Sequence, residues 1–131
     1  MIHTTHRKAI EAYQALGRIW NRPFRIKDSR NLMMLRMELE KEAKYHDEEI
    51  QKYLHRYNPT PLENGNYQFA SVEDKNEFEK VLNDMNNEEV DFVIDPVVID
   101  STRYNDDDIR LSPSELYQLN DFIVITDGKE N

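Results

Sequence analysis

The chain has 131 residues, a formal net charge of −9 and 33% charged residues, so much of its surface must be solvated charge. Leucine, isoleucine, valine and phenylalanine make up about a quarter of it, which is enough for a folded core in one domain. The absence of cysteine excludes disulfides, thiolate nucleophiles and cysteine-based zinc sites, and no apolar run is long enough to span a bilayer. The N-terminal segment also lacks the apolar stretch of a secretory signal, so we expect an intracellular protein.

Residues 5–20 are predicted to form an amphipathic helix with Thr4 or Thr5 as its N-cap. Apolar side chains recur there at spacings of three and four, at Ala9, Tyr13, Leu16 and Trp20. The helix must end before Pro23, because proline cannot continue a helix and disfavours the α conformation in the residue before it.

Residues 28–57 are predicted to form one long helix that begins near Asp28 or Ser29. A mostly apolar stripe steps by three or four along it, at Leu32, Leu35, Leu39, Ala43, His46, Ile50, Leu54 and Tyr57. This length far exceeds the mean of about 11–12 residues and favours an antiparallel hairpin with the first helix or a coiled-coil contact. His46 is then a polar member of the packed seam, whereas His3 and His6 are expected to be mobile.

The segment 58–66 carries two prolines and an Asn-Gly pair, which predicts a turn between two parts of the chain. A short strand over 67–70 and a helix over 72–86 are predicted to follow. Ser71 is the expected cap of that helix.

Residues 90–102 are dense in β-branched side chains and predict a strand, which Pro96 must bend or confine to a sheet edge. After a loop, Ser112-Pro113-Ser114-Glu115 is a near-ideal start for a helix over 113–121. Residues 122–125 are expected to form the end of that helix or a final strand.

Together these elements predict an α+β fold with an N-terminal helical hairpin over 1–57, a turn over 58–66 and a small β-α-β-α unit over 67–131. We expect them to pack as one compact domain. The first part carries a net charge of +4 and residues 58–131 carry −13. Three interpretations of this asymmetry stay open: the two ends meet within one fold, meet between protomers, or steer an external partner.

Metal, cofactor and catalytic sites are not predicted. The sequence has no H-E-x-x-H motif, and the acidic loop Asp106–Asp108 lacks the spacing and the glycine of an EF-hand. Three glycines leave little room for a phosphate loop or a dinucleotide-binding motif, and there is no nucleophile motif. We therefore nominate no catalytic residue and expect a non-enzymatic protein without a cofactor.

Bases and aromatic residues alternate between positions 18 and 30, a composition that can stack bases and neutralise phosphates. We do not expect nucleic-acid binding, because an acidic chain is repelled by it. A small anionic ligand such as a nucleotide is an alternative, and its candidate residues are Arg18, Arg22, Arg25 and Arg30. In the simpler interpretation, Trp20 and Phe24 close the core of the hairpin while the arginines face water.

The segment LMMLRMEL over 32–39 has six apolar residues in eight, so it is hydrophobic on more than one face. One stripe can cover the first helix, but Met33, Met34 and Met37 point elsewhere and need a second cover, either the β-α unit or another protomer. We expect these methionines, with Trp20 and Phe24, to form an interface with a protein partner. A homo-oligomer is the alternative, and no membrane contact is expected.

Four segments follow one another along most of residues 7–123: AIEAYQALGRIWNRPFRIKDSRNLMMLRMELEKE, ENGNYQF, EEVDFVID and LSPSELYQLNDFI. This order of helix, proline-linked long helix, glycine turn and LSP-type helix start resembles an uncharacterised family of short proteins encoded by tailed bacteriophages and prophages. The chain departs from the family in its histidine-bearing N-terminus and its Asp106–Asp108 loop. The resemblance supplies no catalytic residues.

What the resemblance implies is non-enzymatic binding, since small phage accessory proteins block host defence enzymes, serve in virion assembly or sequester signalling nucleotides. Our leading hypothesis is a phage-derived interaction protein that docks on a protein partner, a host-defence component among them, through the methionine and aromatic residues. The alternatives are a structural or assembly component of the virion and a sequestering protein for a small anionic nucleotide. The expected location is the cytoplasm of the host cell, or the virion.

Overall fold

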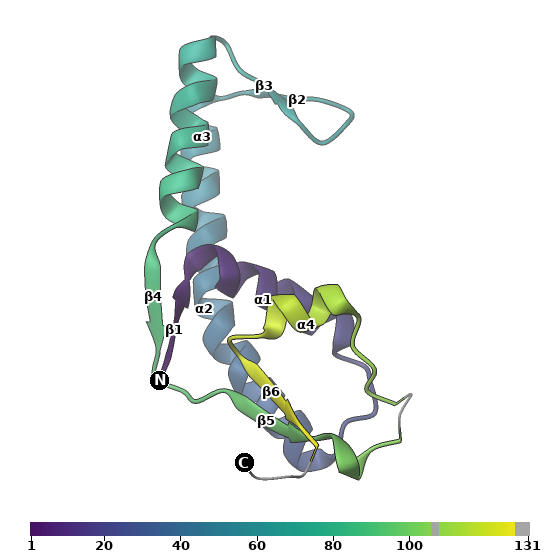
Figure 1. Cartoon of the computed structure of the whole chain (residues 1–131). Helices are drawn as coiled ribbons and strands as arrows, with labels where there is room; N and C mark the ends of the chain where they lie inside the picture. Colours follow the sequence, from purple (N-terminus) through teal and green to yellow (C-terminus); the bar gives the residue numbers. More distant parts are fainter. Residues whose placement is uncertain (106–107, 128–131) are drawn as a thin grey trace.

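A computed structural model describes residues 1–105 and 108–127 (Figure 1). The protein is α+β, as the sequence predicts. Its elements in chain order are β1 (Ile2–Thr5), α1 (His6–Ile19), α2 (Ile26–Tyr57), β2 (Thr60–Pro61), β3 (Tyr67–Gln68), α3 (Val72–Asn86), β4 (Glu89–Phe92), β5 (Val97–Asp100), the 3₁₀ turn η1 (Ser101–Arg103), α4 (Pro113–Leu119) and β6 (Ile123–Thr126).

The long helix α2 runs the length of the molecule and joins its two parts (Figure 1). Its N-terminal half belongs to a body with α1, α4 and the β5–β6 pair. Its C-terminal half forms a stalk with α3, and the β2–β3 hairpin projects from the end of that stalk. Across the described chain, none of the helices combines the length and the apolarity needed to cross a membrane.

Side-chain caps set the starts of three helices where the sequence predicts them. The hydroxyl of Thr5 accepts from the N–H of Lys8, and the hydroxyl of Ser71 starts α3 in the same way. At α4, Ser112 and Glu115 form a complete capping box. These local signals are therefore confirmed.

The helix α2 begins at Ile26, two residues before the predicted start at Asp28. Its N-cap is Arg25, which makes no side-chain capping bond. The helix ends at Tyr57, and its C-cap is Asn58, whose φ of 44° lies in the left-handed region that asparagine tolerates better than most residues. The predicted end is confirmed.

The strands differ from the prediction. The single strand over 90–102 is wrong: β4 pairs antiparallel with β1, and β5 pairs parallel with β6. Pro96 lies between β4 and β5 and has no N–H to donate, so neither ladder continues through it. Residues 67–131 therefore run β-α-β-β-α-β instead of β-α-β-α, and β6 is the final strand that the sequence left open.

The main core gathers residues from the two ends of the chain, residues 2–39 and 92–123. The buried face of α1, formed by Ala9, Ala12, Ala15, Leu16 and Ile19, meets Leu32, Leu35 and Leu39 of α2. Phe122 is fully buried beside them, with its ring centroid 6.1 Å from that of Phe92. Because Phe92 ends β4 and Phe122 precedes β6, this aromatic pair ties the two strand pairs to one core.

We predict that Phe122→Ala lowers the free energy of unfolding by about 3–5 kcal/mol, the usual cost of deleting a buried aromatic ring. The matched control Val93→Ala, at a side chain that is 87% exposed, should change it by no more than about 0.5 kcal/mol. Urea unfolding followed by circular dichroism measures both. Equal, small losses for the two variants would contradict the central position of Phe122.

Candidate functional site

The side chains of Met33, Met34 and Met37 lie on the face of α2 that is turned away from its buried leucine stripe, and we call them the methionine surface. They are 47%, 52% and 58% exposed. Leu32, Leu35 and Leu39 fill the opposite face against α1, so the helix meets the core with one face only. The second cover that the sequence demands for these methionines is not supplied by the described part of the chain.

An apolar pocket of about 240 Å³ adjoins the methionine surface at the junction of α1 and α2. Its lining residues are Ile19, Trp20, Phe24, Ser29, Leu32 and Met33. Three of the five interface candidates thus share one pocket. Met34 lines a different cavity, beside Ile94 and Pro96, and Met37 lies one helical turn beyond Met33.

Two residues that sequence reasoning did not nominate hold the walls of this pocket. The guanidinium of Arg36 lies 4.6 Å from the centre of the Trp20 ring, a cation–π contact that fixes the indole. The rings of Tyr104 and Phe24 meet edge-on, with 6.3 Å between their centroids. The Tyr104 hydroxyl donates a hydrogen bond to the carboxylate of Asp28. Burial and this hydrogen bond raise the pKa of Tyr104. In the sequence, the one signal for the role of Arg36 is its position one helical turn after Leu32, which lines the same pocket.

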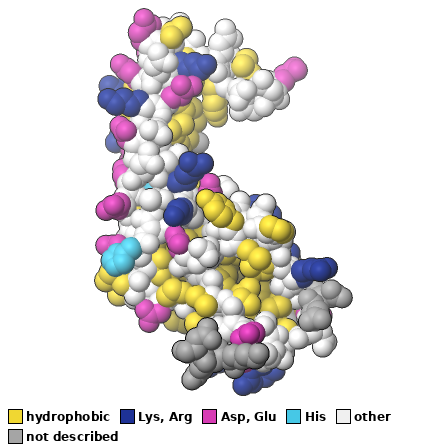
Figure 2. All heavy atoms as spheres, in the orientation of Figure 1, with side chains coloured by type: hydrophobic (Ala, Val, Ile, Leu, Met, Phe, Trp, Pro, Cys, Tyr) yellow, Lys and Arg dark blue, Asp and Glu magenta, His cyan; other side chains and the backbone are white. Residues whose placement is uncertain are grey.

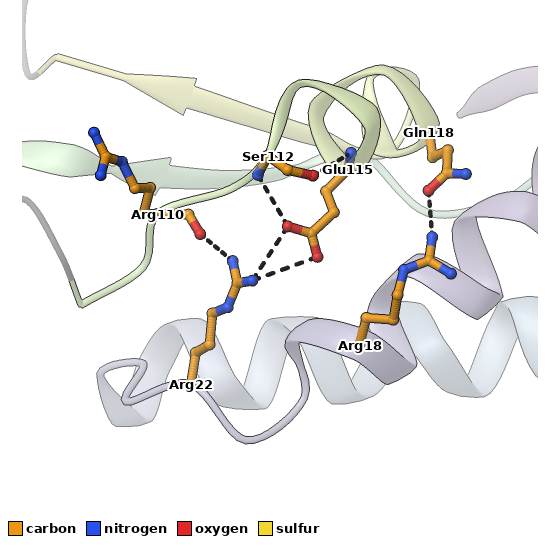
Figure 3. A network of polar contacts seen from close by, with 6 residues as sticks. All are labelled: Arg18, Arg22, Arg110, Ser112, Glu115 and Gln118. Carbon is orange, nitrogen blue, oxygen red and sulfur yellow. Dashed lines mark hydrogen bonds and ion pairs between the residues drawn. The ribbon is translucent and has the colours of Figure 1, made fainter.

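The four anion-binding candidates fall into two groups. Arg18 donates to Gln118, and Arg22 donates to the carbonyl of Arg110 and, at 3.2 Å, to Glu115, so both reach the α4 segment (Figure 3). Arg25 and Arg30 are exposed at the start of α2. The charge of Arg22 is therefore already matched by a carboxylate within the fold.

Glu115 is the acceptor at the centre of the contacts in Figure 3, and it is 7% exposed. The backbone N–H of Ser112 donates to it at 2.9 Å. This bond and the adjacent Arg22 guanidinium hold the pKa of Glu115 below its usual value. The side chain thus works as an internal anchor that fastens α4 to the end of α1.

A buried polar cluster joins the start of α1 to the middle of α2. His6 is fully buried, so the prediction that it is mobile is wrong. Its Nδ1 lies 2.7 Å from Oε2 of Glu42 and its Nε2 lies 2.9 Å from Nδ1 of His46. Burial and the neighbouring His6 lower the pKa of His46. His46 is a polar member of the helix seam, as the sequence predicts.

Metal-binding geometry is not found in the residues that the structure describes, because no three His, Asp or Glu side chains come together in a way that could hold an ion. Within the acidic loop, Asp106 and Asp107 lie outside the described residues. The N–H of Asp108 donates to the carbonyl of Asn105 at 3.1 Å.

A second apolar surface lies on the outer face of the β5–β6 pair. Val97 and Ile123 face the core, whereas their neighbours Val98 and Val124 form the next register pair and are 57% and 44% exposed. Figure 2 shows hydrophobic side chains gathered over this part of the body. Parallel strands are usually covered on both faces, so this surface is a second candidate for contact.

Comparisons of the chain with models of protein families, with curated proteins and with solved structures find no match. The resemblance to phage proteins therefore depends only on the segments quoted from the sequence. The geometry of the site is that of an apolar pocket beside an exposed methionine surface.

We predict that Glu115→Gln lowers the free energy of unfolding by about 1–3 kcal/mol at pH 7, because Arg22 and the N–H of Ser112 lose the charged acceptor that this buried side chain supplies. The pKa of Glu115 is depressed in the folded protein, so its contribution is complete above the unfolded pKa of about 4.3. That contribution disappears as the pH falls through the folded pKa. The difference between wild type and variant should therefore shrink below about pH 4.

Urea unfolding at pH 7, 5 and 3.5 measures this difference. The control is Glu79→Gln, at an exposed position of α3, which should leave stability nearly unchanged at each pH. A destabilisation by Glu115→Gln that stays constant down to pH 3.5 would contradict the anchoring role of the ionised carboxylate.

Proposed function

We propose that the protein is a non-enzymatic interaction protein that docks on a protein partner through the methionine surface and the adjoining pocket. The observation that carries this proposal is the exposure of Met33, Met34 and Met37, at 47–58%, in the one helix around which both parts of the molecule are built. Exposed apolar area of this kind costs free energy in water and is typical of a surface that a partner covers.

The chemistry of the surface also supports this proposal. Methionine is flexible and polarisable, and it is common where a surface has to fit its partner closely. The pocket beside it is lined by two aromatic rings, Trp20 and Phe24, which are rich sources of contact energy at protein interfaces. In keeping with the resemblance to phage proteins, we propose that the partner is a host protein and that a component of host defence is the first candidate.

We predict that a photo-crosslinking amino acid at position 37 captures one discrete partner in cells that make the protein. The double variant Met33→Gln, Met34→Gln, made in the chain that carries the crosslinker at position 37, should lose the crosslink, because glutamine keeps the length and helix propensity of methionine but is polar. Since both side chains are exposed, the free energy of unfolding of this double variant should stay within about 1 kcal/mol of the wild-type value. Mass spectrometry of the crosslinked band identifies the partner.

Two controls make this experiment decisive. A crosslinker at position 72, which is 70% exposed at the start of α3 and therefore at the far end of the stalk, should give no matching band. The variant Val98→Thr changes the outer face of the β5–β6 pair and should leave the crosslink from position 37 intact. If Val98→Thr loses the band and the methionine variant keeps it, the partner binds the β5–β6 pair, and the proposal is wrong.

A further inference from the structure

The pocket at the α1–α2 junction has the size of one side chain. At about 240 Å³ it lies below the roughly 300–1,000 Å³ typical of sites for drug-sized ligands. Interfaces commonly seat one bulky apolar side chain of the partner in such a pocket, near the centre of the contact. Trp20, Phe24 and Met33 give this pocket the apolar lining that such an anchor requires.

The start of α2, which forms one wall of this pocket, carries a charge opposite to that of the whole chain. Residues 24–37 carry four bases and one acid, a net charge of +3 in a protein of −9. The bases are Arg25, Lys27, Arg30 and Arg36. The single acid, Asp28, accepts a hydrogen bond from the Tyr104 hydroxyl.

Within the described residues, Arg25, Lys27 and Arg30 form no ion pair, and we call them the basic rim. Farther along α2 the lysines are matched: the Nζ of Lys41 lies 3.0 Å from Glu38, and that of Lys44 lies 3.7 Å from Glu40. Residues 38–57 carry four bases and six acids, so the surplus of positive charge on α2 is confined to the end that borders the pocket. The basic rim also lies at the positive pole of a 32-residue helix, where cations are unfavourable until an anion approaches.

We propose that the pocket receives an apolar side chain from an acidic segment of the partner, with carboxylates on either side of that anchor meeting the basic rim. This inference rests on the proposed function and adds the chemistry of the partner. A nucleotide could offer a flat base and phosphates to the same residues, but it would leave Met34 and Met37 uncovered. A polypeptide segment can cover the pocket and the methionine surface together.

A selection from a library of random twelve-residue peptides displayed on a carrier tests the proposal. Wild-type protein should enrich sequences with one aromatic or large aliphatic residue flanked by aspartate or glutamate. The variant Lys27→Glu, Arg30→Glu should lose this enrichment. The matched control Lys75→Glu, Lys80→Glu makes the same charge change on α3, at exposed lysines, and should retain it.

The enriched peptides can then be titrated by fluorescence, because Trp20 is the only tryptophan of the chain and lines the pocket. Binding should change its emission, and it should weaken about fivefold or more between 50 and 300 mM salt, as expected when exposed charges contribute. Replacing the anchor residue of the peptide by alanine should abolish binding. Peptides that lack acidic residues, or equal enrichment by the rim variant, would overturn the proposal.

Two further measurements separate the other occupants. If ATP changes the Trp20 emission and displaces the peptides, the occupant is a nucleotide and the proposal is wrong. If light scattering shows a dimer that Lys27→Glu, Arg30→Glu dissociates, the occupant is a second copy of this acidic chain, which also overturns it. If position 37 crosslinks to a partner but the selected peptides show no preference for acidic residues, this inference is wrong and the proposed function still holds.

Discussion

The burial of α1 among the other helices is the constraint on which the rest of the structure depends. Ala9, Ala12 and Ala15 are fully buried, and α1 contacts α2, α3, α4 and β1. Methyl side chains let neighbouring helices approach to the short end of the usual range of about 8–10 Å between axes. A larger side chain at any of these positions would overpack the core and displace α2 or α4. The alanines of α1 therefore decide where α2 can lie.

The open face of α2 follows from this arrangement. The helix turns its leucines toward α1, and β5 contacts it beside that seam. Elements that pack on one side of a helix cannot also cover the opposite side, and α3 contacts α2 only along the stalk, where the ring of Phe78 meets Tyr57. The segment around Met33 and Met37 thus stays exposed because the chain has no further element to place there within the described residues.

Local signals in the sequence predict the helices well. The elements that they do not predict depend on contacts between residues far apart in the sequence. Ser112 and Glu115 cap α4 from within one turn, so their pattern is visible in the sequence. By contrast, β1 exists only because it pairs with β4, with Ile2 opposite Phe92. The same limit applies to the site. The excess of methionine in 32–39 predicts a face that needs a second cover, but no local pattern reveals that Tyr104 packs against Phe24 in the wall of the pocket.

The basic residues of the N-terminal region form two groups, one before Pro23 and one after it. Before it, Arg22 pairs with Glu115, and Lys8 lies 3.8 Å from Asp121, so part of the basic N-terminal region meets the acidic C-terminal region within one fold. After it, the basic rim lies at the N-cap and the first turns of α2, and it forms no ion pair within the described residues. Because the proline ends α1 and lets α2 start in a new direction, the two groups of bases are held apart. Ion pairs within the fold involve Lys8 and Arg22 of the first group, whereas the basic rim is free to meet an external partner within the described structure.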